Sequence, residues 1–112
     1  MSKPIRHYSE FWPYYLREHA KPQTRALHYL GTGLATAAMI GLAITGRLWL
    51  VPLVLVAGYG PAWVAHFFVE KNRPATFTYP LWSLVSDYRL AWTWATGRLG
   101  TELAKAGVNQ HR

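Results

Sequence analysis

The sequence predicts an all-α membrane protein, a hairpin of two transmembrane helices with flanking N-terminal and C-terminal interfacial helices. Hydrophobic residues make up 51% of the 112 residues and charged residues only 15%, whereas a soluble domain has about 25% charged residues. Two long uncharged segments lie on either side of Gly46 and Arg47. Six tryptophans and seven tyrosines belong to the residue types that gather at membrane interfaces. We expect residues 1–112 to form a single membrane-embedded domain, because this length suits one.

The N-terminal segment 9–20, SEFWPYYLREHA, predicts a short amphipathic helix. Ser9 is a suitable N-cap, and Pro13 is tolerated because it lies near the start of the helix. The aromatic side chains of the segment suit the lipid headgroup layer. Residues 21–25, KPQTR, are expected to form a turn.

The two central segments predict the transmembrane hairpin. Segment 26–45 has no charged residue and is long enough to cross the hydrocarbon core. Residues 46–47 break it, segment 48–69 returns, and Pro61 predicts a kink in the second span. Small side chains in the first span would let the second helix approach closely; they are Gly31, Gly33, Ala35, Ala37, Ala38 and Gly41.

The C-terminal third of the chain predicts a loop and one more helix. Residues 71–80, KNRPATFTYP, contain two prolines that disfavour helix in the residues before them. Residues 81–99 are expected to form the third helix, and Asp87 and Arg89 favour a position at the interface over a full crossing. The polar residues after Gly100 are expected to fray.

The positive charges indicate how the chain lies in a membrane. The net charge is +7, and the Lys and Arg residues flank the two spans, with only Arg47 in the hairpin turn. The excess of Lys and Arg on cytoplasmic segments therefore predicts that both termini face the cytoplasm. We expect an integral membrane protein of the bacterial inner membrane that contacts lipid headgroups and no nucleic acid.

Three histidines are predicted to converge at one end of the hairpin. His28 lies 18 residues before Gly46 and His66 lies 19 residues after Arg47. At about 1.5 Å per residue, the two imidazoles come level to within roughly one turn. His19 is nine residues before His28, and Glu70 is four residues after His66 and so shares its helical face. Ionisable groups at membrane depth usually mark a functional site.

The chemistry of this group allows several interpretations. The chain has no cysteine, so a metal would be held by His, Asp or Glu side chains. Iron, zinc or manganese suits such ligands. Three protein ligands on iron leave positions for dioxygen chemistry, whereas zinc with three His and one water would favour hydrolysis. The spacing does not choose between them, and each imidazole taken singly also fits a hydrogen-bonded helix end or a headgroup contact.

Two blocks of sequence, 14–32 (YYLREHAKPQTRALHYLGT) and 58–90 (GYGPAWVAHFFVEKNRPATFTYPLWSLVSDYRL), resemble the 2-hydroxy fatty acid dioxygenase family. Its members are membrane iron(II) enzymes of fatty acid α-oxidation. The resemblance implies that the chain uses Fe2+ and O2, without 2-oxoglutarate. The implied substrate is a long-chain 2-hydroxy fatty acid, which loses CO2 and becomes one carbon shorter. The implied metal ligands, which are also catalytic, fall on His19, His28 and His66.

The matched stretch contains further polar residues whose roles are assigned by chemistry. Lys71 or Arg73 would hold the substrate carboxylate, Arg as a bidentate fork. Glu70 is expected to be catalytic, and the sequence leaves open whether it binds the metal directly. Neutral His ligands need partners that orient them; the residues expected in that role are Glu70, Asp87, Tyr79 and Asn72.

A different class of function also fits the sequence. The chain could be a non-enzymatic membrane protein that binds lipid or assists assembly, with a structural His cluster. A zinc-dependent lipid hydrolase is a weaker alternative. The sequence does not decide substrate chain length, stereochemistry or whether the C-terminal helix inserts, and a homo-oligomer is compatible with it.

Overall fold

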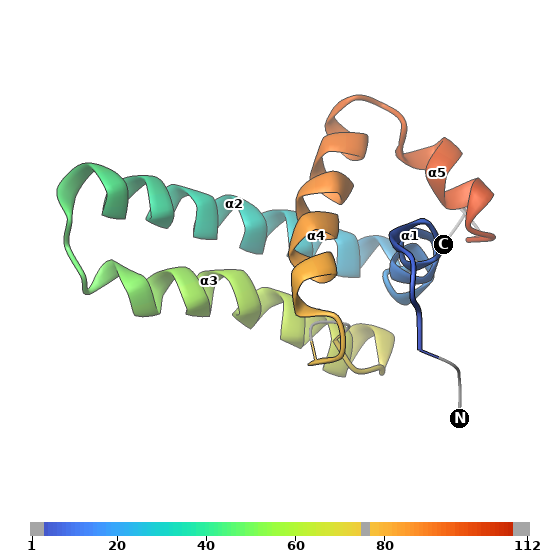
Figure 1. The fold of residues 1–112 in the computed structure, drawn as a ribbon, viewed down its shortest axis with the longest axis horizontal. Helices are drawn as coiled ribbons and strands as arrows, with labels where there is room; N and C mark the ends of the chain where they lie inside the picture. The colour runs from blue at the N-terminus through green and yellow to red at the C-terminus, as the bar shows by residue number, and fades with distance from the viewer. Residues whose placement is uncertain (1–3, 75–76, 109–112) are drawn as a thin grey trace.

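The computed structural model describes residues 4–74 and 77–108, and within these ranges the chain is all-helical with no strand, as predicted (Figure 1). Five α-helices and one π-helix follow one another along the described parts of the chain. Their bounds are α1 Tyr8–Glu18, α2 Pro22–Thr45, α3 Leu50–Val64, the π-helix η1 Ala65–Glu70, α4 Pro80–Ala95 and α5 Leu99–Lys105.

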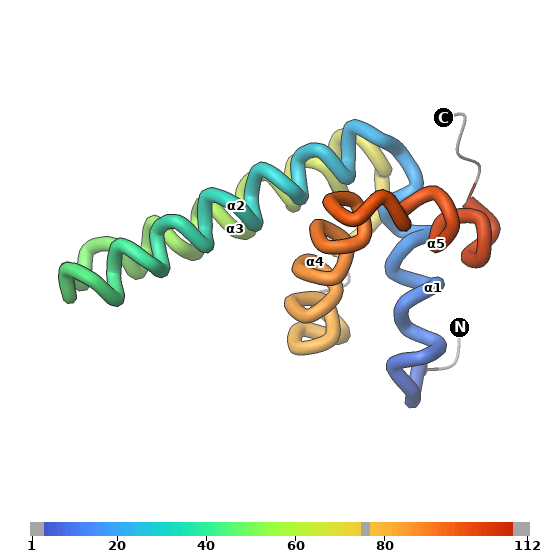
Figure 2. Tube along the Cα trace, turned by 90° about the horizontal axis from the view of Figure 1, so that it is seen from above, coloured from blue at the N-terminus to red at the C-terminus, as the bar shows by residue number. Residues whose placement is uncertain are grey.

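The predicted hairpin is formed by α2 and by α3 with η1, which run side by side and project away from the other helices (Figures 1 and 2). Pro22–Thr45 and Leu50–Glu70 have 24 and 21 residues and are long and apolar enough to cross a membrane. Only 11% and 22% of their most apolar stretches are buried, which separates them from core helices of a soluble protein. Gly46 ends α2 with φ of 66° and closes the turn, as the sequence predicts.

The two helices of the hairpin meet closely at Gly31. A Cβ atom placed there would lie 3.0 Å from the carbonyl oxygen of Ala57 and 3.1 Å from that of Gly58. Pro61 has no N–H to donate to the Ala57 carbonyl four residues earlier, so this oxygen is free to face α2. Pro61 lies inside α3, and the α-helix gives way to η1 four residues later.

Several predicted boundaries are wrong in ways that matter for the site. The predicted turn at 21–25 is helical from Pro22 onward, because proline fits the first position of a helix. Ser9 does not cap α1, since the helix begins at Tyr8 and His7 is its N-cap. The third helix begins at Pro80 but ends at Ala95, before a turn at Gly97 with φ of 75°.

The first part of the C-terminal segment predicted to fray lies in a helix, α5, which packs against α1 and α4. Residues 109–112 of that segment lie outside the described residues. Leu103 of α5 is 3% exposed, and it joins a core outside the hairpin. A helix this short is unstable alone and depends on such packing. The buried residues of this core are Phe11, Trp12, Tyr15, Leu16, Leu90, Leu103, Ala106 and Val108.

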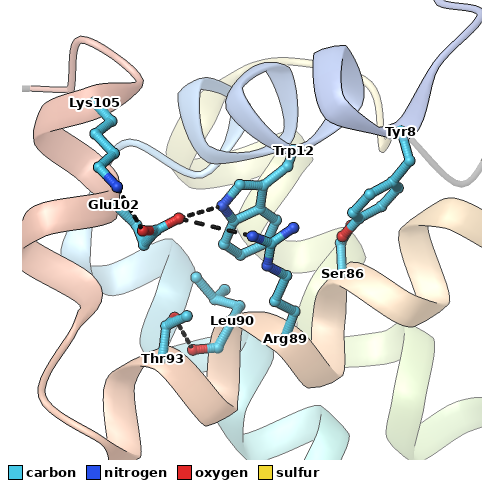
Figure 3. A network of polar contacts seen from close by, with 8 residues as sticks. All are labelled: Tyr8, Trp12, Ser86, Arg89, Leu90, Thr93, Glu102 and Lys105. Atoms are coloured by element: carbon cyan, nitrogen blue, oxygen red, sulfur yellow. Dashed lines mark hydrogen bonds and ion pairs between the residues drawn. The ribbon is translucent and has the colours of Figure 1, made fainter.

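A polar cluster at Glu102 also joins α1, α4 and α5 (Figure 3). The indole nitrogen of Trp12 donates a 2.8 Å hydrogen bond to Glu102 Oε1. The Arg89 guanidinium is 3.9 Å from the same oxygen and lies over the Trp12 ring, 4.2 Å from its centre. These contacts fix α1 relative to α4 and α5, and α1 carries the first histidine of the site.

Candidate metal centre

His19, His28 and His66 meet in the interior, although they come from three different elements. His19 is the C-cap of α1, His28 lies in the second turn of α2, and His66 lies in η1. The Nε2 atom of His19 is 3.0 Å from Nε2 of His28 and 3.1 Å from Nε2 of His66. All three side chains are buried, with exposures of 1%, 4% and 2%.

The backbone fixes the ring orientation of two of these histidines. Nδ1 of His19 lies 2.6 Å from the carbonyl oxygen of Tyr15, and Nδ1 of His28 lies 2.9 Å from that of Thr24. Each carbonyl belongs to the residue four positions earlier. A carbonyl oxygen only accepts hydrogen bonds, so both Nδ1 atoms carry the proton and donate it. Each Nε2 of the neutral ring then presents a lone pair.

Asn72 also holds His66 in the neutral form that carries its proton on Nδ1. The Asn72 side-chain nitrogen donates to the carbonyl oxygen of Glu18 at 3.2 Å, which fixes the direction of the amide. The Asn72 side-chain oxygen therefore faces Nδ1 of His66 at 2.6 Å and accepts its proton. Lys71, with φ of 64°, turns the chain after η1 and brings Asn72 back onto the helix it has just left.

The result is three imidazole lone pairs directed at one another, an arrangement that repels unless a cation lies among them. Two nitrogens bound at right angles to one ion, each about 2.1 Å away, are roughly 3 Å apart. The histidines line a cavity of about 10 Å³, about the room that one small ligand needs. The donor set, its spacing and its burial all fit a metal ion, so this triad can bind one.

Burial keeps His19 ready to act as a ligand. It lowers the pKa of His19 well below 6.5, and the neighbouring imidazoles of His28 and His66 lower it further. A metal binds the neutral form of imidazole, which is the form that burial favours. Arg25, itself buried, donates to the carbonyl oxygens of His19 and Ala20 and so holds the end of α1 against α2.

Tyr15 and Asp87 form a second polar pair beside the triad. The Tyr15 ring stacks on His19 with centroids 4.0 Å apart, and its hydroxyl donates to Asp87 Oδ1 at 2.5 Å. Burial raises the pKa of Asp87 to about 6, against the opposing effect of this hydrogen bond. Burial and the Asp87 charge raise the pKa of Tyr15 well above 10.0, so its hydroxyl stays a donor.

Ser83 is a site residue that the sequence did not reveal. It lies one turn before Asp87 on α4, is 3% exposed and lines the same small cavity as the histidines. Its hydroxyl finds no hydrogen-bond partner among the residues that the structure describes. A buried polar group without a partner is uncommon and calls for an explanation. One serine in an apolar helix carries no signal that would have found it.

Glu70, a predicted site residue, lies beside the triad, but its carboxylate forms a hydrogen bond with the start of α2. Its carboxylate accepts a 2.6 Å hydrogen bond from the backbone N–H of Lys21, the N-cap of α2. The Lys21 ammonium in turn donates to the carbonyl oxygen of Val69. A carboxylate stabilises the N-terminal end of a helix. Glu70 therefore joins η1 to the start of α2.

Three more predicted residues lie away from the small cavity. Lys71 is exposed, and the Arg73 guanidinium lies over the Phe77 ring at 5.3 Å. The Tyr79 hydroxyl accepts a 2.9 Å hydrogen bond from the Ile5 N–H. Over the described ranges, none of Lys71, Arg73 and Tyr79 lines the cavity at the histidines, whereas Asp87 does.

Fold and site together define an all-helical protein with two helices long enough to cross a membrane and a buried His triad able to bind a metal ion. The chain belongs to the 2-hydroxy-palmitic acid dioxygenase Mpo1-like family, whose model matches residues 5–99. This match confirms the resemblance seen in the sequence and includes all three histidines. Comparisons with curated proteins and with solved structures give no match.

Proposed function

We propose that the chain is an iron(II)-dependent dioxygenase that shortens 2-hydroxy fatty acids by one carbon. The observation that carries the proposal is the set of three converging imidazoles with uncommitted Nε2 lone pairs, in a chain that belongs to a dioxygenase family. An all-nitrogen site suits iron(II). His19, His28 and His66 would hold the ion, and three protein ligands leave positions for the substrate and O2.

The reaction balances with O2 as the only oxidant and with no added reductant. A 2-hydroxy acid, R–CH(OH)–COOH, and one O2 give R–COOH, CO2 and H2O. The bond between C1 and C2 breaks, C1 leaves as CO2, and C2 becomes the new carboxyl carbon. Bound iron would supply the activation of O2, which otherwise reacts slowly with closed-shell organic acids.

The chain's own residues would position the reactants. Asn72 keeps Nδ1 of His66 protonated and the ring fixed, as orienting partners of metal-bound histidines do. The unpartnered Ser83 hydroxyl would donate to the polar head of the substrate. Asp87, with its pKa raised to about 6, would accept the proton of the C2 hydroxyl near neutral pH.

The same proposal places the protein in a membrane. The two apolar helices would cross the bilayer, and both termini would lie in the cytoplasm. In a bacterium this bilayer would be the inner membrane. Helices α1, α4 and α5 would lie at the cytoplasmic interface and complete a single domain with the hairpin. A substrate with a polar head and an apolar tail could then reach the site without leaving the lipid.

The test is O2 uptake by purified protein loaded anaerobically with Fe2+ and given 2-hydroxyhexadecanoate. We expect CO2 and pentadecanoate in equal amounts. His66→Ala should lose both bound iron and turnover, whereas the exposed His7→Ala should keep both. Folded wild-type protein that takes up no iron and shows no turnover would favour the non-enzymatic alternative.

A further inference from the structure

A second cavity, of about 230 Å³, lies between the hairpin and α4. On α2 it is lined by Thr32, Ala35 and Met39, which recur at helical spacing and so share one face. On the other helices its walls include Val54, Leu55 and Leu84. The walls are mainly apolar, as in sites for the hydrocarbon part of a ligand.

This groove adjoins the cavity at the histidines. Tyr59 and Asp87 line both cavities, so one end of the groove lies against the polar pocket and the other end points along α2 toward Met39. From Thr32 to Met39 the groove follows α2 for about 10 Å. The polarity therefore changes along its length from charged and polar to apolar, which is the polarity of a fatty acid.

Two features set the width of the groove. Ala35 and Gly58 meet where α2 packs on α3, since a Cβ placed on Gly58 would lie 3.4 Å from the Cβ of Ala35. The Tyr88 hydroxyl forms a 2.6 Å hydrogen bond with Thr36 Oγ1, which ties α4 to α2 beside the groove. The hairpin thus contributes a floor of small side chains, and α4 covers it.

We propose that this groove holds the acyl chain of the substrate, and that the small side chain of Ala35 leaves room for a long chain to pass. The proposal rests on the proposed function, because it places the carboxylate and hydroxyl of a 2-hydroxy acid at the small cavity beside Ser83. The first carbons of the tail then run past Tyr59 and Asp87 and along α2. A longer chain continues beyond Met39 toward the exposed apolar face of the hairpin.

The first test fills the groove with Ala35→Leu and compares it with Ala37→Leu, on the same helix but exposed and outside the groove. We expect Ala35→Leu to lower kcat/KM for 2-hydroxyhexadecanoate at least tenfold and that for 2-hydroxyoctanoate less than twofold. Ala37→Leu should change neither. Equal losses in the two variants, or equal losses for the two acids, would overturn the proposal.

The second test needs no turnover and no variant. Iron-loaded wild-type protein is kept without O2 and given a long-chain 2-hydroxy acid with a photoreactive diazirine in mid-chain. We expect the label on half-buried residues of the groove, such as Ala35, Val54 or Gly58. Label that falls instead on lipid-facing residues such as Ile40 and Leu53, which are exposed and line no part of the groove, would overturn the proposal.

Together the two tests distinguish a failure of the proposed acyl site from a failure of the proposed dioxygenase function. Turnover of both acids with label outside the groove would refute the acyl site and leave the dioxygenase function standing. Label within the groove and no turnover of either acid would refute the function and retain a lipid site.

Discussion

The side-chain oxygen of Asn72 accepts a 2.6 Å hydrogen bond from Nδ1 of His66. The side-chain amide of Asn72 cannot flip, because its nitrogen donates to the carbonyl oxygen of Glu18. One side chain thus connects the end of α1, which carries His19, to the ring of His66. The relative position of two of the three imidazoles depends on this link.

Asn72→Ala is expected to weaken iron binding by about 10- to 100-fold, the usual effect of removing a partner that orients a metal ligand. Isothermal titration of anaerobic apoprotein with Fe2+ measures it. Asn72→Asp keeps an acceptor for His66 but loses the donor to Glu18. It should therefore bind iron more tightly than Asn72→Ala while being less stable than wild type. Iron affinity unchanged in Asn72→Ala would show that His66 needs no such partner.

Ser83→Ala should lower kcat/KM for 2-hydroxyhexadecanoate by about 10- to 150-fold, since a hydrogen bond to a charged group contributes about 1.5–3 kcal/mol. Iron content should stay the same, and stability should not fall, because the hydroxyl has no partner to lose among the described residues. Ser86→Ala is the matched control on the same helix. Ser86 bonds to the Tyr8 hydroxyl, so this variant should lose about 1 kcal/mol of stability and keep its turnover. The reverse pattern would assign Ser83 a structural role.

Asp87→Asn should change how the stability of the metal-free protein depends on pH. Burial raises the pKa of Asp87 from 3.8 to about 6 in the folded state, so the folded protein holds the proton more tightly than the unfolded chain. The protonated carboxyl stabilises the fold fully below pH 3.8, and this contribution of about 3 kcal/mol is lost as pH rises through about 6. The asparagine side chain would carry no charge and would still accept the Tyr15 hydrogen bond. The free energy of unfolding, measured from about pH 4 to 8, should be larger for the variant than for wild type above the pKa of Asp87. Parallel plots of this free energy against pH would refute the raised pKa of Asp87.

Gly31→Ala should destabilise the hairpin by about 1–3 kcal/mol, because the new methyl group would press on the carbonyl oxygens of Ala57 and Gly58. Gly33→Ala is the control, since nothing lies within 4 Å of the position that its new methyl group would take, and alanine favours helix. Unfolding of the two variants in mixed micelles compares them directly. Equal stabilities would mean that α2 and α3 do not need the close approach at Gly31.

Much of this arrangement follows from simple counting along the sequence. The uncharged segments and the break at Gly46 predict the hairpin, and equal distances from that break predict that His28 and His66 come level. Asn72 was among the residues expected to orient the ligands, and it contacts His66. These features are predictable because they depend on helical rise and on hydrophobicity, both of which act locally.

The features that the sequence did not predict depend on tertiary contacts or on an irregular backbone. Helix α5 is short and polar, and it forms because Leu103 finds a core on α1 and α4. The four-residue spacing predicts that Glu70 shares a helical face with His66. Residues 65–70 instead form a π-helix, which pairs residues five apart, and the Glu70 carboxylate reaches Lys21. The position of Ser83 beside the histidines follows only once α4 packs against the hairpin.

The attachment of α1 has a consequence for how the protein is made. The helix that brings His19 is held by Tyr15 on Asp87 and by Trp12 on Glu102, and both partners are synthesised long after the third histidine. When only the hairpin has been synthesised, the chain already carries His19, His28 and His66, but α1 still lacks its two side-chain partners on α4 and α5. The metal site should accordingly be complete only after Asp87 and Glu102 have been synthesised.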